Sequence, residues 1–218
     1  MLNEDNCVYK KSQVKGFAIL ALYVDDILLA SNNMEYLQEI KEWFSSIFEM
    51  KDMGEANYIL GIKIMRDRKT KRLWMSQETY EKKVLEKFFM SKSKPLEIPL
   101  AKSSPLVKQR YDANSPQADD RYLSAIGSLM YAMVSTRPDI CHAVGMVARY
   151  QSDPRYEHWQ AVKRIMRYVK GTLDYSLCYD GNGHLGVVGY CDADYAGDMD
   201  DRKSTYGYVF IMSNAAIS

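Results

Sequence analysis

The sequence predicts an α+β protein in which antiparallel strands flank a helical middle region. Short apolar runs bounded by turn residues occur near both ends of the chain, which is typical of neighbouring antiparallel strands. Residues 119–171 instead carry apolar residues at the three-and-four spacing of amphipathic helices. Residues 91–118 contain several prolines and little periodicity, which favours a linker between two packed regions.

The most informative stretch is 17–30, where two apolar runs meet at Asp25 and Asp26. The run from Phe17 to Leu22 is apolar on both of its alternating faces, which is typical of a strand covered on both sides. Adjacent carboxylates at the end of such a strand raise each other's cost of ionisation, so a divalent cation suits them. An acidic hairpin turn is an equal alternative, because Asp is common in turns.

The N-terminal part predicts a small sheet followed by a helix. Strands are expected at 7–10 and 17–22, and a return strand follows Asp26. Asn32 or Asn33 can cap the next helix. An amphipathic helix of this kind can cover the sheet. Its apolar residues are Leu37, Ile40, Trp43, Phe44 and Ile47.

A second hairpin is expected at 58–65 and 73–76, and its connection, 66–72, is strongly basic. A basic turn is usually only solvated, although a cationic tip also suits backbone phosphates. Ser76 can cap a helix that ends at Phe89, with apolar residues on one side and lysines on the other.

Three helices are expected between 119 and 171. The first runs to about Ser135 and the second starts at Pro138. The third starts at Asp153-Pro154, where the acid caps the helix and proline occupies its first turn, and Gly171 is placed to end it in a left-handed conformation. Its polar face is largely basic, which suits either solubility or nucleic acid. The basic residues are Arg155, Lys163, Arg164, Arg167 and Lys170.

The C-terminal part again predicts antiparallel strands. They are expected at 175–179, 186–192 and 206–212. A turn at 181–183 contains two glycines, which favour a tight connection between such strands. We therefore expect a further sheet here.

A second group of carboxylates lies in this C-terminal part. Asp192 and Asp194 are two residues apart and would face the same way on a strand. A calcium loop of the EF-hand type does not fit, because Ala196 and Lys203 stand where oxygen ligands are required. An acidic turn and a metal site remain as alternatives. The following loop adds Asp198, Asp200 and Asp201.

Bulk properties restrict the class of protein. The chain of 218 residues is 47% apolar, enough for one or two packed cores, and its net charge of +1 gives no global case for nucleic-acid binding. A signal peptide and a membrane-spanning run are not expected, so we expect a soluble intracellular protein. The cysteines are spaced unlike zinc ligands, which indicates reduced thiols: Cys7, Cys141, Cys178 and Cys191.

The sequence resembles the reverse transcriptases of the Ty1/copia class of retrotransposons. The resemblance is most specific at Tyr23-Val24-Asp25-Asp26, which looks like the aspartate-pair motif of these enzymes. It covers essentially the whole chain. The other matching segments, in order, are Lys51-Asp52-Met53-Gly54-Glu55-Ala56, Leu60-Gly61-Ile62, Met75-Ser76-Gln77-Glu78, Gly127-Ser128-Leu129-Met130-Tyr131, Thr136-Arg137-Pro138-Asp139-Ile140, His158-Trp159, Lys170-Gly171-Thr172, Asp192-Ala193-Asp194 and Asp201-Arg202-Lys203-Ser204-Thr205.

The resemblance implies a domain organisation. Residues 1–90 would form the C-terminal part of a truncated polymerase palm sheet, with its covering helix and the start of the thumb. Residues 91–118 would be a linker and 119–171 a helical thumb and connection region. Residues 172–218 would be the first strands of a ribonuclease H-like domain.

The resemblance also implies functional residues and partners. Asp25 and Asp26 would be catalytic metal ligands of the polymerase, and Asp192 of the ribonuclease H, with Asp194 able to tune that site. Mg²⁺, or Mn²⁺, would be the cofactor. The partners would be an RNA template, a DNA primer, an RNA/DNA hybrid and deoxynucleotides, in the cytoplasm or a virus-like particle, with nuclear access and without a membrane. Nucleic acid would contact Tyr23, Arg66, Arg68, Lys71, Arg72, Trp74, Ser76, Gln77, Lys163, Arg164, Arg167 and Lys170.

Parts of both active sites are expected to be missing. The family's third polymerase aspartate comes from an earlier strand, and only Glu4 and Asp5 precede the motif as carboxylates here. The fingers and the later ribonuclease H carboxylates are also absent. We therefore expect a chain that is inactive alone; the alternatives are a non-catalytic RNA/DNA-binding module and a non-functional retroelement relic.

Overall fold

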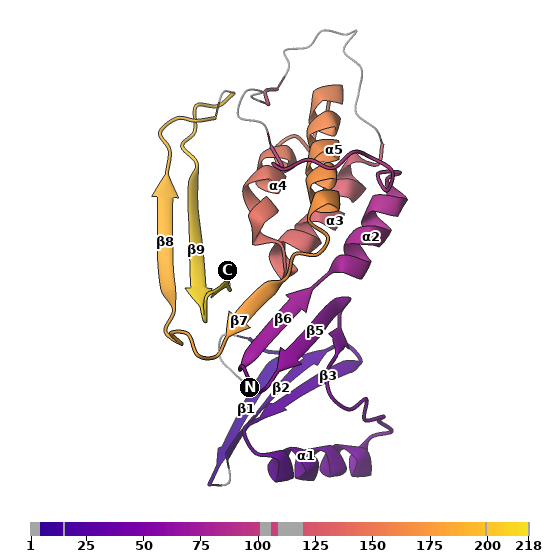
Figure 1. The fold of residues 1–218 in the computed structure, drawn as a ribbon, viewed down its shortest axis with the longest axis vertical. Helices are drawn as coiled ribbons and strands as arrows, with labels where there is room; N and C mark the ends of the chain where they lie inside the picture. The colour runs from indigo at the N-terminus through magenta and orange to yellow at the C-terminus, as the bar shows by residue number, and fades with distance from the viewer. Residues whose placement is uncertain (1–4, 15, 101–105, 109–119, 199, 218) are drawn as a thin grey trace. The chain divides into compact units, whose positions relative to one another are not determined.

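The computed structural model describes residues 5–14, 16–100, 106–108, 120–198 and 200–217. The chain divides into two compact units, of which the first ends at Ala56 and the second begins at Asn57. Each unit is described by itself. The described residues form antiparallel sheets and five α-helices, so the predicted α+β class is confirmed (Figure 1).

The first unit is a three-stranded antiparallel sheet with one helix, in the strand order β1-β2-β3. The Asn33 side chain caps the helix as predicted, because its Oδ1 accepts hydrogen bonds from the backbone N–H groups of Glu35 at 2.9 Å and Tyr36 at 3.1 Å. Packing places the helix against β2 and β3. The elements are β1 (Val8–Gln13), β2 (Gly16–Tyr23), β3 (Asp26–Ser31) and α1 (Met34–Ile47).

The strand β2 is less buried than its composition predicts. Only Ala18 is buried among its residues, at 5% exposure, whereas Phe17 and Leu22 are each 38% exposed. The expectation that both of its faces are covered is not met within this unit. The reason is that the described residues of the unit supply one helix, and one helix covers a single face of a sheet.

The second unit begins with a four-stranded antiparallel sheet, in the order β4-β5-β6-β7. The single strand expected at 58–65 is broken, because Leu60 and Gly61 both adopt positive φ angles, of 50° and 76°. β7 adds to β6 although Arg72 and Asp180, which pair across the two strands, are 108 residues apart in sequence. The strands are β4 (Tyr58–Ile59), β5 (Ile62–Asp67), β6 (Arg72–Ser76) and β7 (Leu177–Asp180).

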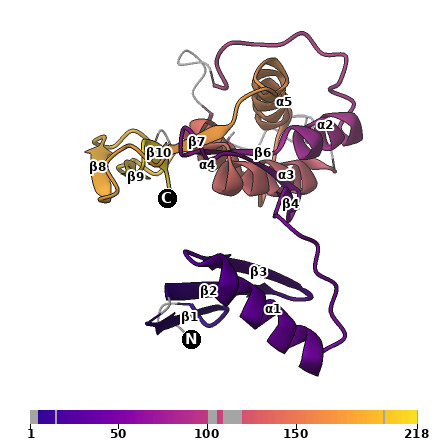
Figure 2. The same cartoon turned by 60° about the horizontal axis from the view of Figure 1, so that its bottom comes forward.

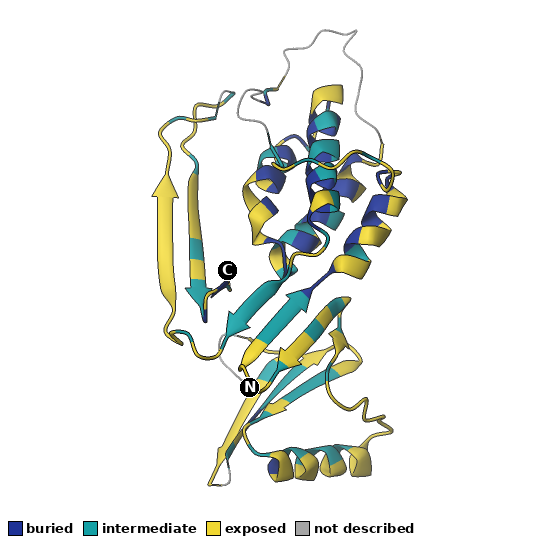
Figure 3. Ribbon diagram, viewed as in Figure 1, coloured by how far each residue is buried: buried dark blue, intermediate teal, exposed yellow. Residues whose placement is uncertain are grey.

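Four helices lie between β6 and β7 in the chain, pack together and enclose the main hydrophobic core. Figure 3 shows their buried residues along the sides that face one another. The side chains of Ile126, Val162 and Ile165 are fully buried in it. None of the helices in the described part of the chain is long and apolar enough to cross a membrane. The helices are α2 (Glu78–Lys87), α3 (Tyr122–Ser135), α4 (Cys141–Ala148), preceded by a 3₁₀ turn (Pro138–Ile140), and α5 (Tyr156–Gly171).

The start of α5 differs from the prediction of a cap at Asp153-Pro154. The helix begins at Tyr156, and the Arg155 backbone N–H donates to Nδ1 of His158 at 2.9 Å. Asp153 does not cap the helix, because it lies two residues before the N-cap residue Arg155; its carboxylate is paired with the Arg155 guanidinium at 2.9 Å.

The end of α5 also differs, because Gly171 is helical and does not adopt a positive φ angle. Glycine is favoured at this position because there is no room for a side chain. A Cβ at Gly171 would lie 3.1 Å from Cβ of Pro95 and 3.3 Å from the carbonyl oxygen of Leu96. The Leu96 N–H donates to the carbonyl of Arg167 at 3.2 Å, so the expected linker is held against α5 here. The rest of that linker lies largely outside the described residues.

The C-terminal strands form a third antiparallel sheet, in the order β10-β9-β8. The prediction that the strand expected at 175–179 belongs to this sheet is wrong, because β7 pairs with β6 instead. β10 lies beside β7, as Figure 2 shows. There the Tyr179 hydroxyl donates to the carbonyl of Ala216 at 2.9 Å. The strands are β8 (Val188–Ala193), β9 (Tyr206–Met212) and β10 (Ala215–Ala216).

We predict that replacing glycine by alanine gives a lower free energy of unfolding at Gly171 than at Gly127. Gly127 lies in α3, and no atom lies within 4 Å of the point that a Cβ would occupy there. Gly127→Ala should stabilise the protein by about 0.5–1 kcal/mol, because alanine favours a helix. Gly171→Ala should be at least about 1 kcal/mol less stable than Gly127→Ala, because its methyl group meets Pro95 and Leu96. Urea unfolding of both variants measures this, and equal gains would show that the 95–96 segment does not press on α5.

Candidate functional site

The β2–β3 turn presents the aspartate pair. Tyr23 pairs with Asp26, which leaves Val24 and Asp25 as a two-residue turn. Val24 has a φ angle of 51°, which is unusual for a β-branched residue and costs about 1–3 kcal/mol. Its side chain is 81% exposed, so packing interactions do not compensate for this strain. Backbone strain of this kind is concentrated at functional sites.

Asp25 and Asp26 offer oxygen ligands for a hard cation. Both residues are exposed, and no described residue donates a hydrogen bond or forms an ion pair with either carboxylate. Carboxylate oxygens suit Mg²⁺. Within the described part of the chain, however, no three His, Cys, Asp or Glu side chains come together to hold a metal ion. The pair therefore fits a divalent cation as two ligands of a larger set.

The second candidate carboxylate, Asp192, lies on the exposed strand β8, where it accepts a hydrogen bond from the N–H of Ala193 at 2.9 Å. Asp194 follows the end of this strand. Its Oδ1 accepts from the N–H of Thr205 at 2.5 Å, and its side chain lies over Gly197. Asp194 thus organises the β8–β9 loop, and Asp192 is the more available of the two.

The remaining acids of the β8–β9 loop hold that loop against α4. Asp198 accepts from the backbone N–H groups of Asp201 and Asp200, which lower its pKa, and it pairs with Arg149 at 3.1 Å. Asp200 accepts from the Lys108 N–H at 2.8 Å. The residues that make these contacts line a surface hollow of about 350 Å³. The loop carboxylates are thus used within the fold, which agrees with the failed match to a calcium loop.

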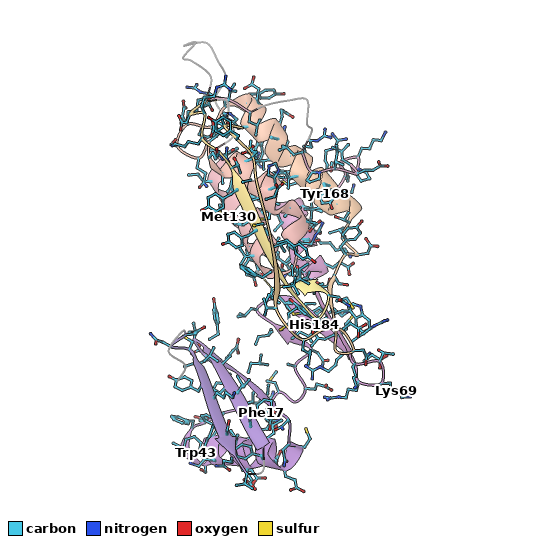
Figure 4. All side chains as sticks on the ribbon, turned by 90° about the vertical axis from the view of Figure 1, so that its left-hand side faces the viewer. Phe17, Trp43, Lys69, Met130, Tyr168 and His184 are labelled. Atoms are coloured by element: carbon cyan, nitrogen blue, oxygen red, sulfur yellow. The ribbon has the colours of Figure 1, made fainter. Side chains whose placement is uncertain are left out.

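The basic hairpin turn between β5 and β6 is braced by the turn that follows β7. The Gly181 N–H donates to the carbonyl of Lys71 at 2.7 Å, and Asn182 Nδ2 donates to the carbonyl of Thr70 at 2.9 Å. Arg72 pairs with Asp180 at 3.2 Å. Lys69 lies at the outer end of the hairpin (Figure 4). A surface hollow of about 350 Å³ here is lined by Arg66, Asp67, Arg68, Lys71, Arg72 and Leu73.

The other predicted nucleic-acid contacts, in β6 and just after it, are partly or fully buried. Trp74 is half-buried, and Ser76 and Gln77 are 7% and 1% exposed. The Ser76 hydroxyl accepts from the Glu78 N–H at 3.3 Å, and Oε1 of Gln77 accepts from the Thr136 hydroxyl at 2.8 Å. Ser76 and Gln77 therefore join β6 to the helices and are not available to a ligand at the surface. Tyr23, by contrast, is 58% exposed.

The basic residues of α5 are partly buried. Arg167 Nε donates to the carbonyl of Lys94 at 2.6 Å, and Lys170 Nζ donates to that of Ser93 at 2.5 Å. Lys163 lies over the Trp159 ring, with Nζ 5.8 Å from the centroid, and Arg164 is also only partly exposed. This face of α5 binds the 93–96 segment, a use that its sequence pattern did not predict.

A buried arginine is the main feature that sequence reasoning missed. Arg137 is 1% exposed and donates to both oxygens of Asp139 at 3.0 and 2.9 Å, and to Glu81 at 3.0 Å. It also bonds the Thr172 hydroxyl at 2.5 Å. The sequence marks the segment Thr136-Arg137-Pro138-Asp139-Ile140 only as a family resemblance. The signal that could have indicated the burial of Arg137 is its position between two strongly apolar helices.

The pKa values of the two carboxylates around Arg137 are shifted in opposite directions. Burial opposes ionisation of Asp139, but its bonds from Arg137 and Tyr168 outweigh burial and hold its pKa below the ordinary value. Burial raises the pKa of Glu81 to about 7, although Arg137 acts in the opposite direction. Oε2 of Glu81 has no hydrogen-bond partner among the described residues. Asp139 accepts two hydrogen bonds from Arg137 and one from Tyr168, whereas Glu81 accepts one from Arg137, so burial dominates only at Glu81.

Comparison with known proteins identifies the family. Residues 3–102 match the family described as reverse transcriptase (RNA-dependent DNA polymerase). The chain is 48% identical over 219 aligned positions to the retrovirus-related Pol polyprotein from transposon TNT 1-94 of Nicotiana tabacum, covering 98% of the chain and 16% of that protein. It is 34% identical over 214 positions to the corresponding polyprotein from transposon RE1 of Arabidopsis thaliana, covering 98% and 14%.

A shorter relative is an uncharacterised mitochondrial protein of Arabidopsis thaliana, 36% identical over 201 positions that cover 91% of the chain and 80% of that protein. No solved structure matches the chain. These matches define the class as that of reverse transcriptase sequences. The chain belongs to the reverse transcriptase family of copia-type retrotransposons, as its motifs predict. It spans 14–16% of the length of the polyproteins that it matches.

We predict that Glu81 makes stability fall between about pH 5 and 8. Its pKa is raised from 4.5 to about 7 in the folded protein, so the folded state binds this proton more tightly. The stabilisation is complete below the unfolded value and is lost as the pH rises through 7, by up to about 3 kcal/mol. Glu81→Gln keeps an acceptor for Arg137 but does not titrate. Urea midpoints of the two proteins should therefore diverge with pH, and a constant difference would mean that Glu81 does not change protonation over this range.

Proposed function

We propose that Asp25 and Asp26 are two of the carboxylates of an RNA-directed DNA polymerase site. The observation that supports this most directly is the strained turn at Val24, which presents both side chains without any partner among the described residues. A carboxylate pair held in this way is ready to bind cations, because no internal hydrogen bond has to be broken first. Asp192 on β8 is proposed as a carboxylate of a ribonuclease H site.

Asp25 and Asp26 would hold Mg²⁺, or Mn²⁺, which in nucleotidyl transfer stabilises charge on the attacking and leaving oxygens. The contribution of the chain is to fix the two carboxylates at the turn. At least one further carboxylate is required from outside the described residues, since these bring no third ligand to the pair. We propose that the described residues by themselves do not form a complete metal site.

The proposed partners are an RNA template, a DNA primer, their hybrid and deoxynucleotides. The proposed division is palm and start of thumb at 1–90, linker at 91–118, thumb and connection at 119–171, and ribonuclease H-like strands from 172. The basic hairpin supports the proposed partners, because it is cationic and its turn is hydrogen-bonded to the turn at 180–182. The proposed compartment is the cytoplasm or a virus-like particle.

A second candidate function is non-catalytic binding of an RNA/DNA hybrid. The same lack of a third metal ligand among the described residues favours it. The two functions share the basic hairpin and differ only in whether Asp25 and Asp26 support chemistry.

We predict that primer extension distinguishes these functions. The chain alone should not extend a primer on RNA with Mg²⁺ or Mn²⁺. A chimera in which it replaces the matching segment of the tobacco polyprotein should extend the primer, and Asp25→Asn or Asp26→Asn should reduce the rate by about 10³-fold or more, by removing a metal ligand. Asp52→Asn, which changes an exposed acid paired with Lys41, is the control.

Activity of the chimera that survives both substitutions would refute the catalytic assignment. Extension by the chain alone that disappears in Asp25→Asn would keep the assignment and refute the need for a further carboxylate.

We predict that the basic hairpin contributes to binding of an RNA/DNA hybrid. Arg68→Gln with Lys71→Gln should weaken binding and reduce the slope of log K against log salt concentration by about 1 for each phosphate that the hairpin no longer neutralises. Lys10→Gln with Lys11→Gln removes the same charge from exposed positions on β1 and should change the slope less. Fluorescence anisotropy between about 50 and 200 mM salt measures both. Equal slopes in the two double variants would argue against a hairpin contact.

A further inference from the structure

Phe89 occupies a backbone position that glycine usually takes. It follows the C-cap residue of α2, Phe88, and has a φ angle of 59°. The Met90 N–H donates to the carbonyl of Leu85 at 2.7 Å, and the Phe89 N–H donates to that of Glu86 at 3.0 Å. These two bonds form a Schellman motif, whose left-handed residue is most often glycine. Phenylalanine is strained at this position.

Packing does not explain this strained phenylalanine. The neighbouring side chains of Phe88 and Met90 are 3% and 7% exposed and lie in the helical core. They fix the backbone on both sides, so the Phe89 ring is directed outward and is 81% exposed. A large aromatic side chain kept in water by a strained backbone indicates a binding role.

One cationic side chain lies over this ring, and two lysines lie near it in the sequence. The Arg121 guanidinium carbon lies 5.3 Å from the Phe89 ring centroid. Lys87 reaches the same junction of α2 and α3, where its Nζ donates to the Ser124 hydroxyl at 2.7 Å. Lys92, three residues beyond Phe89, is exposed. Charge of this sign is complementary to a phosphate backbone, and an exposed aromatic face is complementary to a nucleobase.

We infer that Phe89 is a stacking platform for an unpaired base of single-stranded nucleic acid, with Lys87, Lys92 and Arg121 facing its phosphates. This rests on the proposed nucleic-acid function and adds a site in the second unit that is separate from the basic hairpin. Stacking on an aromatic side chain is tolerant of sequence, so the platform accepts any base. An adjacent cation over the same ring strengthens such a site.

The test separates binding from folding. Phe89→Gly removes the ring and relieves the strained backbone, so its melting temperature should rise by about 2–4 °C. Its affinity for a fluorescein-labelled oligothymidylate of about 16 nucleotides should nevertheless fall about tenfold. Phe89→Trp should bind as tightly as the parent protein, because it keeps an aromatic face. Leu60→Gly is the matched control, since Leu60 is 40% exposed at a φ angle of 50° and has no aromatic ring.

Unchanged affinity in Phe89→Gly overturns the inference, as does parental affinity in Phe89→Leu, which keeps an apolar side chain without an aromatic face. Loss of self-association in Phe89→Gly with unchanged oligonucleotide binding also overturns it, because the ring would then serve a protein contact. If Phe89→Gly does not change oligonucleotide affinity while Arg68→Gln with Lys71→Gln still weakens hybrid binding, the stacking role of Phe89 is refuted. The proposed nucleic-acid function is then retained.

Discussion

The second unit depends on the buried guanidinium of Arg137. Its partners come from three elements: Glu81 of α2, Asp139 of the 3₁₀ turn, and Thr172, which follows α5. The Tyr168 and Tyr175 rings also lie near it, with centroids 5.7 and 5.5 Å from its central carbon. Removing one partner of a buried ion pair costs about 3–5 kcal/mol, because the other charge stays uncompensated. The packing of these helix ends therefore requires Arg137 together with all of its hydrogen-bonding partners.

The position of this cluster connects the helices to the sheet. α2 directly follows β6, and β7 follows α5 after a short segment, so Arg137 holds both places where the chain passes between sheet and helices. The β6–β7 pairing closes the same connection from the sheet side. The basic hairpin is consequently mounted on a sheet that is fixed at two points. A cationic surface held in this way loses little conformational entropy when it meets phosphates.

Local features of the fold were predictable and distant ones were not. The Asn33 cap and the β2–β3 hairpin depend on neighbouring residues, so the sequence pattern indicated them correctly. The β6–β7 pairing joins residues 108 apart, and no local pattern encodes it. The predicted role of Gly171 was wrong for the same reason, because its neighbour Pro95 belongs to a distant segment. For the candidate site, the pattern located Asp25 and Asp26 but could not tell that Gln77 is buried.

The two groups of aspartates show why residue type alone does not define a metal site. Asp198 and Asp200 accept hydrogen bonds from backbone N–H groups and neighbouring side chains, so a cation would have to displace contacts that hold the β8–β9 loop. Asp25 and Asp26 have no such contacts with the described residues, and the turn that carries them is strained at Val24. Stability alone would favour glycine or asparagine in place of valine at such a φ angle. A strained turn that leaves two carboxylates without partners among the described residues is understandable if a cation, completed by ligands from elsewhere, supplies the missing interaction.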